Sequence, residues 1–141
     1  MKKILLILIS LIIILAFLIS LMNKTKVESD GLSLKIGDEE RIISYSALDK
    51  MEKVNFQTER GDEYSGYQLL PLLHKNGMNE CKYLTLFSED GGSLRLNEID
   101  HADAYLIWQS DTEKPGLRLI ISSDEFGQRW MKNLIAIEIH N

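Results

Sequence analysis

The distribution of apolar and polar residues divides the chain into three unequal parts. An uncharged, strongly apolar run extends from Ile4 to Met22, and a polar stretch without large apolar residues other than Val27 follows. From residue 31 onward, apolar and polar residues alternate over short distances, which is typical of half-buried strands. The pattern predicts an N-terminal anchor over residues 1–22, a tether over 23–30 and one folded domain over 31–141.

The apolar run has the length and flanks of a transmembrane helix over residues 4–22. At 1.5 Å per residue it would extend about 30 Å, the thickness of the hydrocarbon core of a bilayer. No small-x-small cleavage site and no cysteine stand near its end, so we expect an uncleaved anchor, with a cleaved signal peptide as the alternative. Lys2 and Lys3 favour an internal N-terminus. The expectation is a single-pass protein of the cell membrane, with its domain on the extracytoplasmic side.

The rest of the chain predicts an α+β domain of mostly short strands in mixed sheets with two short helices. Ser44 or Ser46 is a candidate N-cap for a helix near Ala47, and a second helix begins at Tyr67, with Pro71 in its first turn and Gly77 as C-terminal cap. Residues 61–66 are expected to form a loop. Strands are predicted at 32–36, 41–43, 54–58, 83–87, from 94 onward, and at 104–108, 117–121 and 134–139.

Charge and cysteine content exclude several classes of protein. The chain has 16 basic and 21 acidic residues, a formal net charge of -5. Lys2 and Lys3 are the only charged residues before Asn23, so the domain itself is more acidic still. Such a domain is a poor binder of nucleic acid, because the phosphate backbone repels it. The single cysteine, Cys81, can form neither an internal disulfide nor a zinc site made of thiolates, and it is expected to be a small, partly buried residue at a strand edge.

No catalytic motif is present, and the histidines at 74, 101 and 140 are scattered and expected at the surface, with His101 in a loop. We therefore predict no catalytic residue and no metal ligand. The least ordinary segment lies between the last two predicted strands and contains Arg129, Trp130 and Lys132. Arginine and lysine are natural phosphate partners, and tryptophan can stack on a heterocycle. The alternative is a surface loop whose tryptophan fills the core and whose basic groups pair with acids.

Four segments resemble the oxidoreductase molybdopterin-binding domain family, which has the sulfite oxidase fold. The likeness covers roughly residues 40 to 140, with the segments in the family's order. The segments are Tyr64–Leu73 followed by Gly77, Ser88–Gly91, Pro115–Ile121, and Arg129–Leu134 followed by Ile137 and Glu138. The resemblance implies a mixed-sheet fold with a pterin cleft, in which Arg118, Arg129, Trp130 and Lys132 would bind the molybdopterin cofactor.

The chain also departs from the family at the metal. Enzymes of the family bind molybdenum through a cysteine thiolate that follows the strand matching Val54–Thr58, and this sequence has no cysteine there. A soft thiolate is not replaced in kind by threonine or glutamate. The His-Gly that precedes the proline in many members is replaced by Glu113 and Lys114.

Three functions remain open at this point. The first is a non-catalytic member of the fold that binds a ligand, or a protein partner in the membrane or outside it. The second is a molybdopterin-dependent oxidoreductase or an accessory subunit of one. The third is an unrelated acidic interaction domain. Because fold does not fix function, the site must decide between them.

Overall fold

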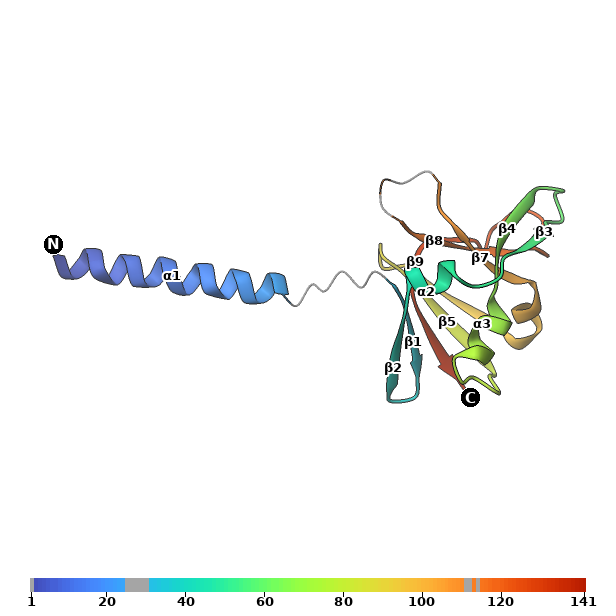
Figure 1. The fold of residues 1–141 in the computed structure, drawn as a ribbon, viewed down its shortest axis with the longest axis horizontal. Helices are drawn as coiled ribbons and strands as arrows, with labels where there is room; N and C mark the ends of the chain where they lie inside the picture. The colour runs from blue at the N-terminus through green and yellow to red at the C-terminus, as the bar shows by residue number, and fades with distance from the viewer. Residues whose placement is uncertain (1, 25–30, 111–112, 114) are drawn as a thin grey trace.

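The structure is a computed structural model that describes residues 2–24, 31–110, 113 and 115–141. Figure 1 shows one long helix, α1 (Lys2–Lys24), and a strand-rich part that begins at residue 31. Helical conformation of the apolar run is thus confirmed. The predicted tether falls largely on residues 25–30, which lie outside the described residues.

The prediction of a transmembrane helix over residues 4–22 is corrected by the structure. A helix that crosses a bilayer needs about 20 consecutive, predominantly apolar residues. Among the residues that the structure describes, no helix is both long enough and apolar enough to cross a membrane.

The strand-rich part is α+β with a mixed sheet and few helices, as predicted. Two short α-helices and one 3-10 helix accompany the strands, namely α2 (Tyr45–Asp49), α3 (Leu69–Lys75) and η1 (Glu98–Asp103). The strands are β1 (Gly31–Ile36), β2 (Glu39–Ser44), β3 (Val54–Gln57), β4 (Glu63–Gln68), β5 (Tyr83–Ser88), β6 (Ser93–Asn97), β7 (Ala104–Trp108), β8 (Leu117–Ile121) and β9 (Met131–His140).

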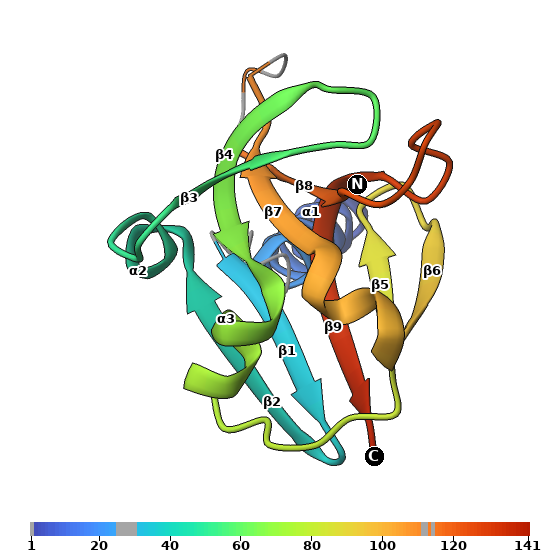
Figure 2. The same cartoon turned by 90° about the vertical axis from the view of Figure 1, so that its right-hand side faces the viewer.

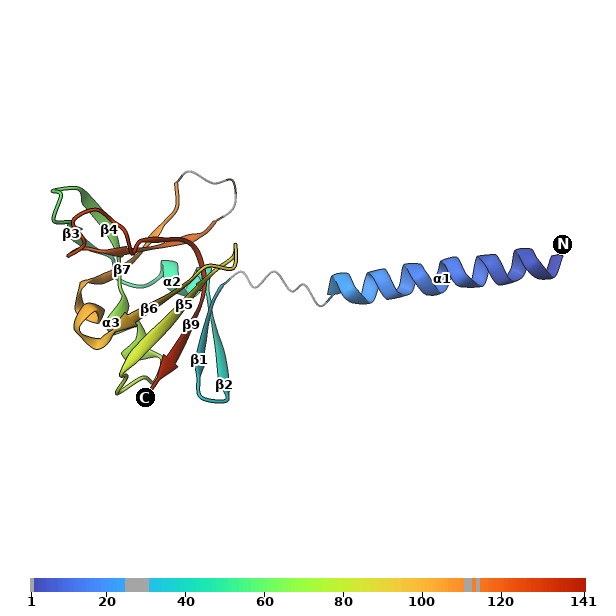
Figure 3. The same ribbon diagram turned by 180° about the vertical axis from the view of Figure 1, so that it is seen from behind.

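The sheet branches at its last strand. Its main order is β2-β1-β9-β8-β7-β4-β3, while β5 joins β9 separately and carries β6. The first part of β9 pairs with β8, and the part from Ala136 onward lies between β1 and β5. The β1–β9 pairing is parallel, whereas the other pairings are antiparallel. Figures 2 and 3 show the β1–β2 and β5–β6 hairpins on either side of β9.

One core lies on the inward face of these strands. Leucines alternate with more exposed residues along β1 and β5, and both strands bury every second side chain. Helix α3 contacts β4, β7 and η1 and buries Leu69, Leu72 and Leu73. Each fully buried leucine is stabilising by about 1.5–3 kcal/mol. These side chains therefore supply the main force that holds the hairpins together.

Local signals identified the helix caps, but the predicted start of the second helix at Tyr67 is wrong, because Tyr67 lies in β4 and α3 begins at Leu69. The Ser44 hydroxyl accepts a hydrogen bond from the Ala47 amide at 3.1 Å, so Ser44 is the N-cap of α2. Pro71 is the third residue of α3, where its missing N–H leaves no intrahelical bond unmade. Gly77 follows α3 with a φ of 93°, the left-handed conformation expected of a C-terminal cap.

The loop predicted over residues 61–66 is wrong, because β4 begins at Glu63. The stretch is polar and contains Gly66, so its local pattern is that of a turn. The structure pairs residues 63–66 with β3, and the next two residues of β4, Tyr67 and Gln68, pair with β7. A Cβ atom at Gly66 would lie 2.5 Å from the Leu106 carbonyl oxygen, so the glycine permits this close crossing.

Candidate functional site

The four residues expected to bind a cofactor are divided between two places. Arg129, Trp130 and Lys132 line a hollow of about 300 Å³, together with residues of the β5–β6 turn, namely Ser88, Asp90, Gly92, Ser93 and Leu94. We call it the first hollow. Arg118 lies on β8 and is absent from this lining; its guanidinium carbon is 5.4 Å from the centroid of the Trp130 ring. The structure therefore gathers three of the four around one hollow and places the fourth against the indole.

Arg129 is held by two carboxylates. Its Nε donates to both oxygens of Asp124, at 3.0 and 3.1 Å, and Nη2 donates to Asp124 Oδ1 at 2.5 Å. On the other edge, Nη1 lies 2.9 Å from Asp100 Oδ2. The hydrogen bonds that the guanidinium donates to Asp124 first and to Asp100 second raise its pKa above the ordinary value. Two negative charges surround one positive charge, so this arginine offers no net attraction to a phosphate.

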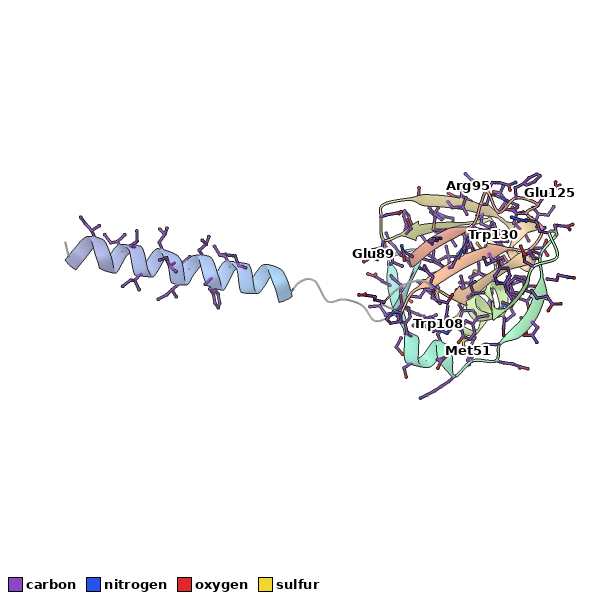
Figure 4. The ribbon with its side chains drawn as sticks, turned by 90° about the horizontal axis from the view of Figure 1, so that it is seen from above. Met51, Glu89, Arg95, Trp108, Glu125 and Trp130 are labelled. Carbon is purple, nitrogen blue, oxygen red and sulfur yellow. The ribbon has the colours of Figure 1, made fainter. Side chains whose placement is uncertain are left out.

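Trp130 has a packing role. Its Nε1 donates to the Ile121 carbonyl at 3.0 Å, and the ring meets Tyr64 edge-on with centroids 6.0 Å apart. Gly127 adopts a φ of 64° directly beneath the indole, where a Cβ atom would approach Trp130 Cδ2 to 2.9 Å. In Figure 4, Trp108 and Trp130 lie within the strand-rich part, whereas Arg95 and Glu125 lie at its rim. These contacts agree with the alternative interpretation of the segment, in which the tryptophan fills space within the domain.

The strand that would precede a metal-binding thiolate carries no soft ligand. Thr58 follows β3, is 5% exposed, and its hydroxyl oxygen has no hydrogen-bond partner among the described residues. The Thr58 amide and carbonyl close the turn to β4 through Asp62 and Gly61. Together with the neutralised Arg129, this donor set does not fit a molybdenum–pterin group.

A second, larger hollow of about 590 Å³ lies where α3, residues 78–82 and η1 meet. Figure 2 shows α3 and η1 on the same side of β1 and β9. Leu70 and Met78 are apolar members of the lining, and Glu80, Glu98 and His101 are polar members. We call it the second hollow. Sequence reasoning missed it, because its walls come from segments separated by polar turns and no periodicity joins them.

His101 is the buried member of this lining, which corrects the prediction of a surface histidine. The side chain is 3% exposed, and its Nε2 lies 3.3 Å from the Leu96 carbonyl oxygen. A carbonyl can only accept, so Nε2 carries a proton and donates to it. The prediction of a loop around His101 is wrong, because residues 98–103 form the 3-10 helix η1.

Cys81 also lies in the second hollow and is partly buried. Its thiol donates to the Tyr83 carbonyl at 3.1 Å. Burial raises the pKa of the thiol, and the Glu98 carboxylate raises it further. A neutral thiol is a weak nucleophile, so Cys81 acts as a small partly buried residue, as predicted. In the described part of the chain, no group of three or more His, Cys, Asp or Glu side chains is arranged to hold a metal ion.

Comparison with known proteins leaves the family open. No protein-family model matches the chain, and no curated protein matches it. The resemblance to molybdopterin-binding domains therefore stays a prediction carried by four sequence segments, and the function has to be argued from the geometry of the two hollows.

Proposed function

We propose that this chain is a non-catalytic binding domain that resembles the molybdopterin-binding fold and lacks its redox chemistry. The observation that carries this proposal is the arrangement around Arg129, whose guanidinium is occupied on both edges by Asp124 and Asp100. An arginine that bound a cofactor phosphate would need at least one of those edges free.

The other residues of the Arg-Trp-x-Lys-Asn segment support the same conclusion. Trp130 is hydrogen-bonded to β8, and Asn133 has a φ of 52° in β9. Both residues therefore shape the backbone where the chain passes from β8 into β9. A sequence could keep this segment for its fold after the metal ligand had been lost.

A molybdopterin carrier or accessory subunit is the second candidate. It is favoured by one observation, namely that Arg129, Trp130 and Lys132 line the same hollow. A pterin bound there would have to displace Asp100 or Asp124 from Arg129, which opposes binding because each contact is charge-assisted.

Both candidates are tested by producing the full chain in a host that makes molybdenum cofactor. The purified protein would be assayed for molybdenum by mass spectrometry and for pterin by the fluorescence of its oxidised derivative. We expect neither in stoichiometric amount. Molybdenum and pterin at one per chain would overturn the proposal, and pterin without metal would establish the carrier. The variant Lys132→Gln is the matched control, because Lys132 lines the same hollow and any cofactor held there must bind more weakly without it.

A further inference from the structure

We propose that the second hollow is a binding site for a small organic amine with an apolar body. This inference rests on the proposed function, since it supplies a ligand class for a binding domain whose ligand is open. It is carried by a hollow with an apolar side and a surplus of carboxylates.

The second hollow has the size and an apolar side suited to a small molecule. At about 590 Å³ the second hollow falls within the range of small-molecule sites, and it is about twice the volume of the first. Met78 is almost completely buried and Leu70 packs against the core, so this side of the hollow is fixed by the fold. An apolar group placed against Leu70 and Met78 would be removed from water at little conformational cost.

Charge decides the polar end of the ligand. The lining contains two carboxylates, Glu80 and Glu98, against the single ammonium group of Lys82. The chain as a whole carries a net charge of -5, so its field favours the approach of cations over anions. An ammonium group near Glu98 would form a charge-assisted hydrogen bond, whereas a carboxylate at the same place would be repelled.

The hydrogen-bonding groups in the lining also favour a ligand that donates hydrogen bonds. His101 Nε2 donates to the Leu96 carbonyl, so this nitrogen is not available to a ligand. The Cys81 thiol gives its proton to Tyr83 and offers no strong donor. The carboxylates of Glu80 and Glu98 are acceptors, and a ligand with N–H donors fits them best.

The experiment uses the full chain with phenethylamine as the probe and 2-phenylethanol as its neutral counterpart. Cys81 is the single cysteine of the chain, so alkylation by iodoacetamide, followed by mass spectrometry, reports on the second hollow alone. A mildly alkaline buffer gives measurable thiolate while an alkylamine stays mostly protonated. We expect phenethylamine to slow alkylation, with a dissociation constant on the order of 1 mM, and 2-phenylethanol to have a weaker effect.

Two exposed glutamates give a matched pair of variants. Glu98→Gln removes the carboxylate proposed to bind the amine, and Glu89→Gln removes one from the β5–β6 turn, outside the second hollow. Because the Glu98 carboxylate itself raises the pKa of the Cys81 thiol, the alkylation rate with phenethylamine is compared with the rate without it in the same variant. Glu98→Gln should weaken protection about tenfold, and Glu89→Gln should leave it unchanged.

The proposal is overturned if phenethylamine gives no protection, if 2-phenylethanol protects equally, or if the two variants behave alike. These outcomes leave the non-catalytic assignment intact, because that assignment depends on the metal and pterin assays. Conversely, stoichiometric molybdenum would overturn the non-catalytic assignment without affecting the result of the alkylation assay with phenethylamine.

Discussion

Gln109 and Asn133 bind each other through two hydrogen bonds across the ends of β7 and β9. Gln109 Nε2 donates to Asn133 Oδ1 at 3.0 Å, and the Asn133 amide donates to Gln109 Oε1 at 2.5 Å. Asn133 is the only non-glycine residue with positive φ in the described part of the chain, and it lies between Met131 and Leu134, the two residues of β9 that pair with β8 across a register shift. The side-chain pair therefore holds the irregular part of the β8–β9 pairing.

Substitution of Asn133 should separate the backbone requirement from the hydrogen bond. Asn133→Gly keeps the left-handed conformation and loses the side-chain bond, with an expected cost of about 1 kcal/mol in the free energy of unfolding. Asn133→Val adds the strain of a β-branched residue at positive φ, for a total of about 3 kcal/mol. Urea unfolding measures both, and a valine variant as stable as the glycine variant would contradict this role.

Removal of Arg129 should destabilise the domain through its partner. Asp124 is 3% exposed and has Arg129 as its charged partner, so Arg129→Gln leaves a buried carboxylate without a counter-ion. We expect a loss of about 3 kcal/mol in the free energy of unfolding. The double variant with Asp124→Asn should recover part of that loss. If the double variant is less stable than Arg129→Gln alone, the buried charge is not the cause.

Two glycines with nearly equal backbone angles offer a controlled comparison. Gly37 and Gly127 have φ values of 60° and 64°, but a Cβ atom meets nothing within 4 Å at Gly37 and meets the Trp130 ring at Gly127. Gly37→Ala should cost about 1 kcal/mol from the left-handed conformation alone. Gly127→Ala should cost about 2 kcal/mol more, because it displaces the indole. Equal losses in thermal unfolding would refute the packing role of Trp130.

The β5–β6 turn should contribute a pH-dependent term to stability. Hydrogen bonds from the Ser88 hydroxyl first and the Gly92 amide second lower the pKa of Asp90 below its ordinary value of 3.8. A carboxyl whose pKa is lower in the folded state stabilises the fold above the unfolded-state pKa, and this contribution is lost as the pH falls through the folded-state pKa. The stability advantage of wild type over Asp90→Asn should therefore be present at neutral pH and shrink below pH 3.8.

Carbon NMR of the Asp90 carboxyl group provides the direct check. Ser88→Ala should return the pKa of Asp90 toward 3.8, because the first of its two hydrogen bonds is removed. A titration curve that does not move in Ser88→Ala would show that the backbone of the turn, and not the hydroxyl, sets the pKa.

Sequence reasoning succeeded where a signal is local. The N-cap at Ser44, the proline in the first turn of α3 and the left-handed Gly77 each depend on a few neighbouring residues. It failed at β4, because Glu63–Gly66 is a strand through its pairing with β3, a segment that the local pattern does not reveal as its partner. The alternation of apolar residues predicted the other strands but carries no information on which strands pair.

The candidate site was predicted less well, since partners distant in the chain determine what a side chain does. Arg129 looked available for a phosphate, and its occupancy depends on Asp100, which is contributed by a different element. The second hollow joins α3, residues 78–82 and η1, and no sequence spacing links them. For Arg129 the residue was identified and its partners were not, whereas the second hollow was not predicted at all.

The position of β9 has a consequence for how the domain folds. The last strand of the chain pairs with β1, β5 and β8, and its partner β1 is the first strand. Contacts between such distant segments demand a large loss of chain entropy before they become favourable, which places folding in the range of milliseconds to seconds. Until residues 131–140 have been synthesised, β1, β5 and β8 each lack this neighbour, and exposed edges of that kind recruit other chains. A product truncated before β9 should therefore aggregate or be degraded, rather than persist as a smaller folded unit.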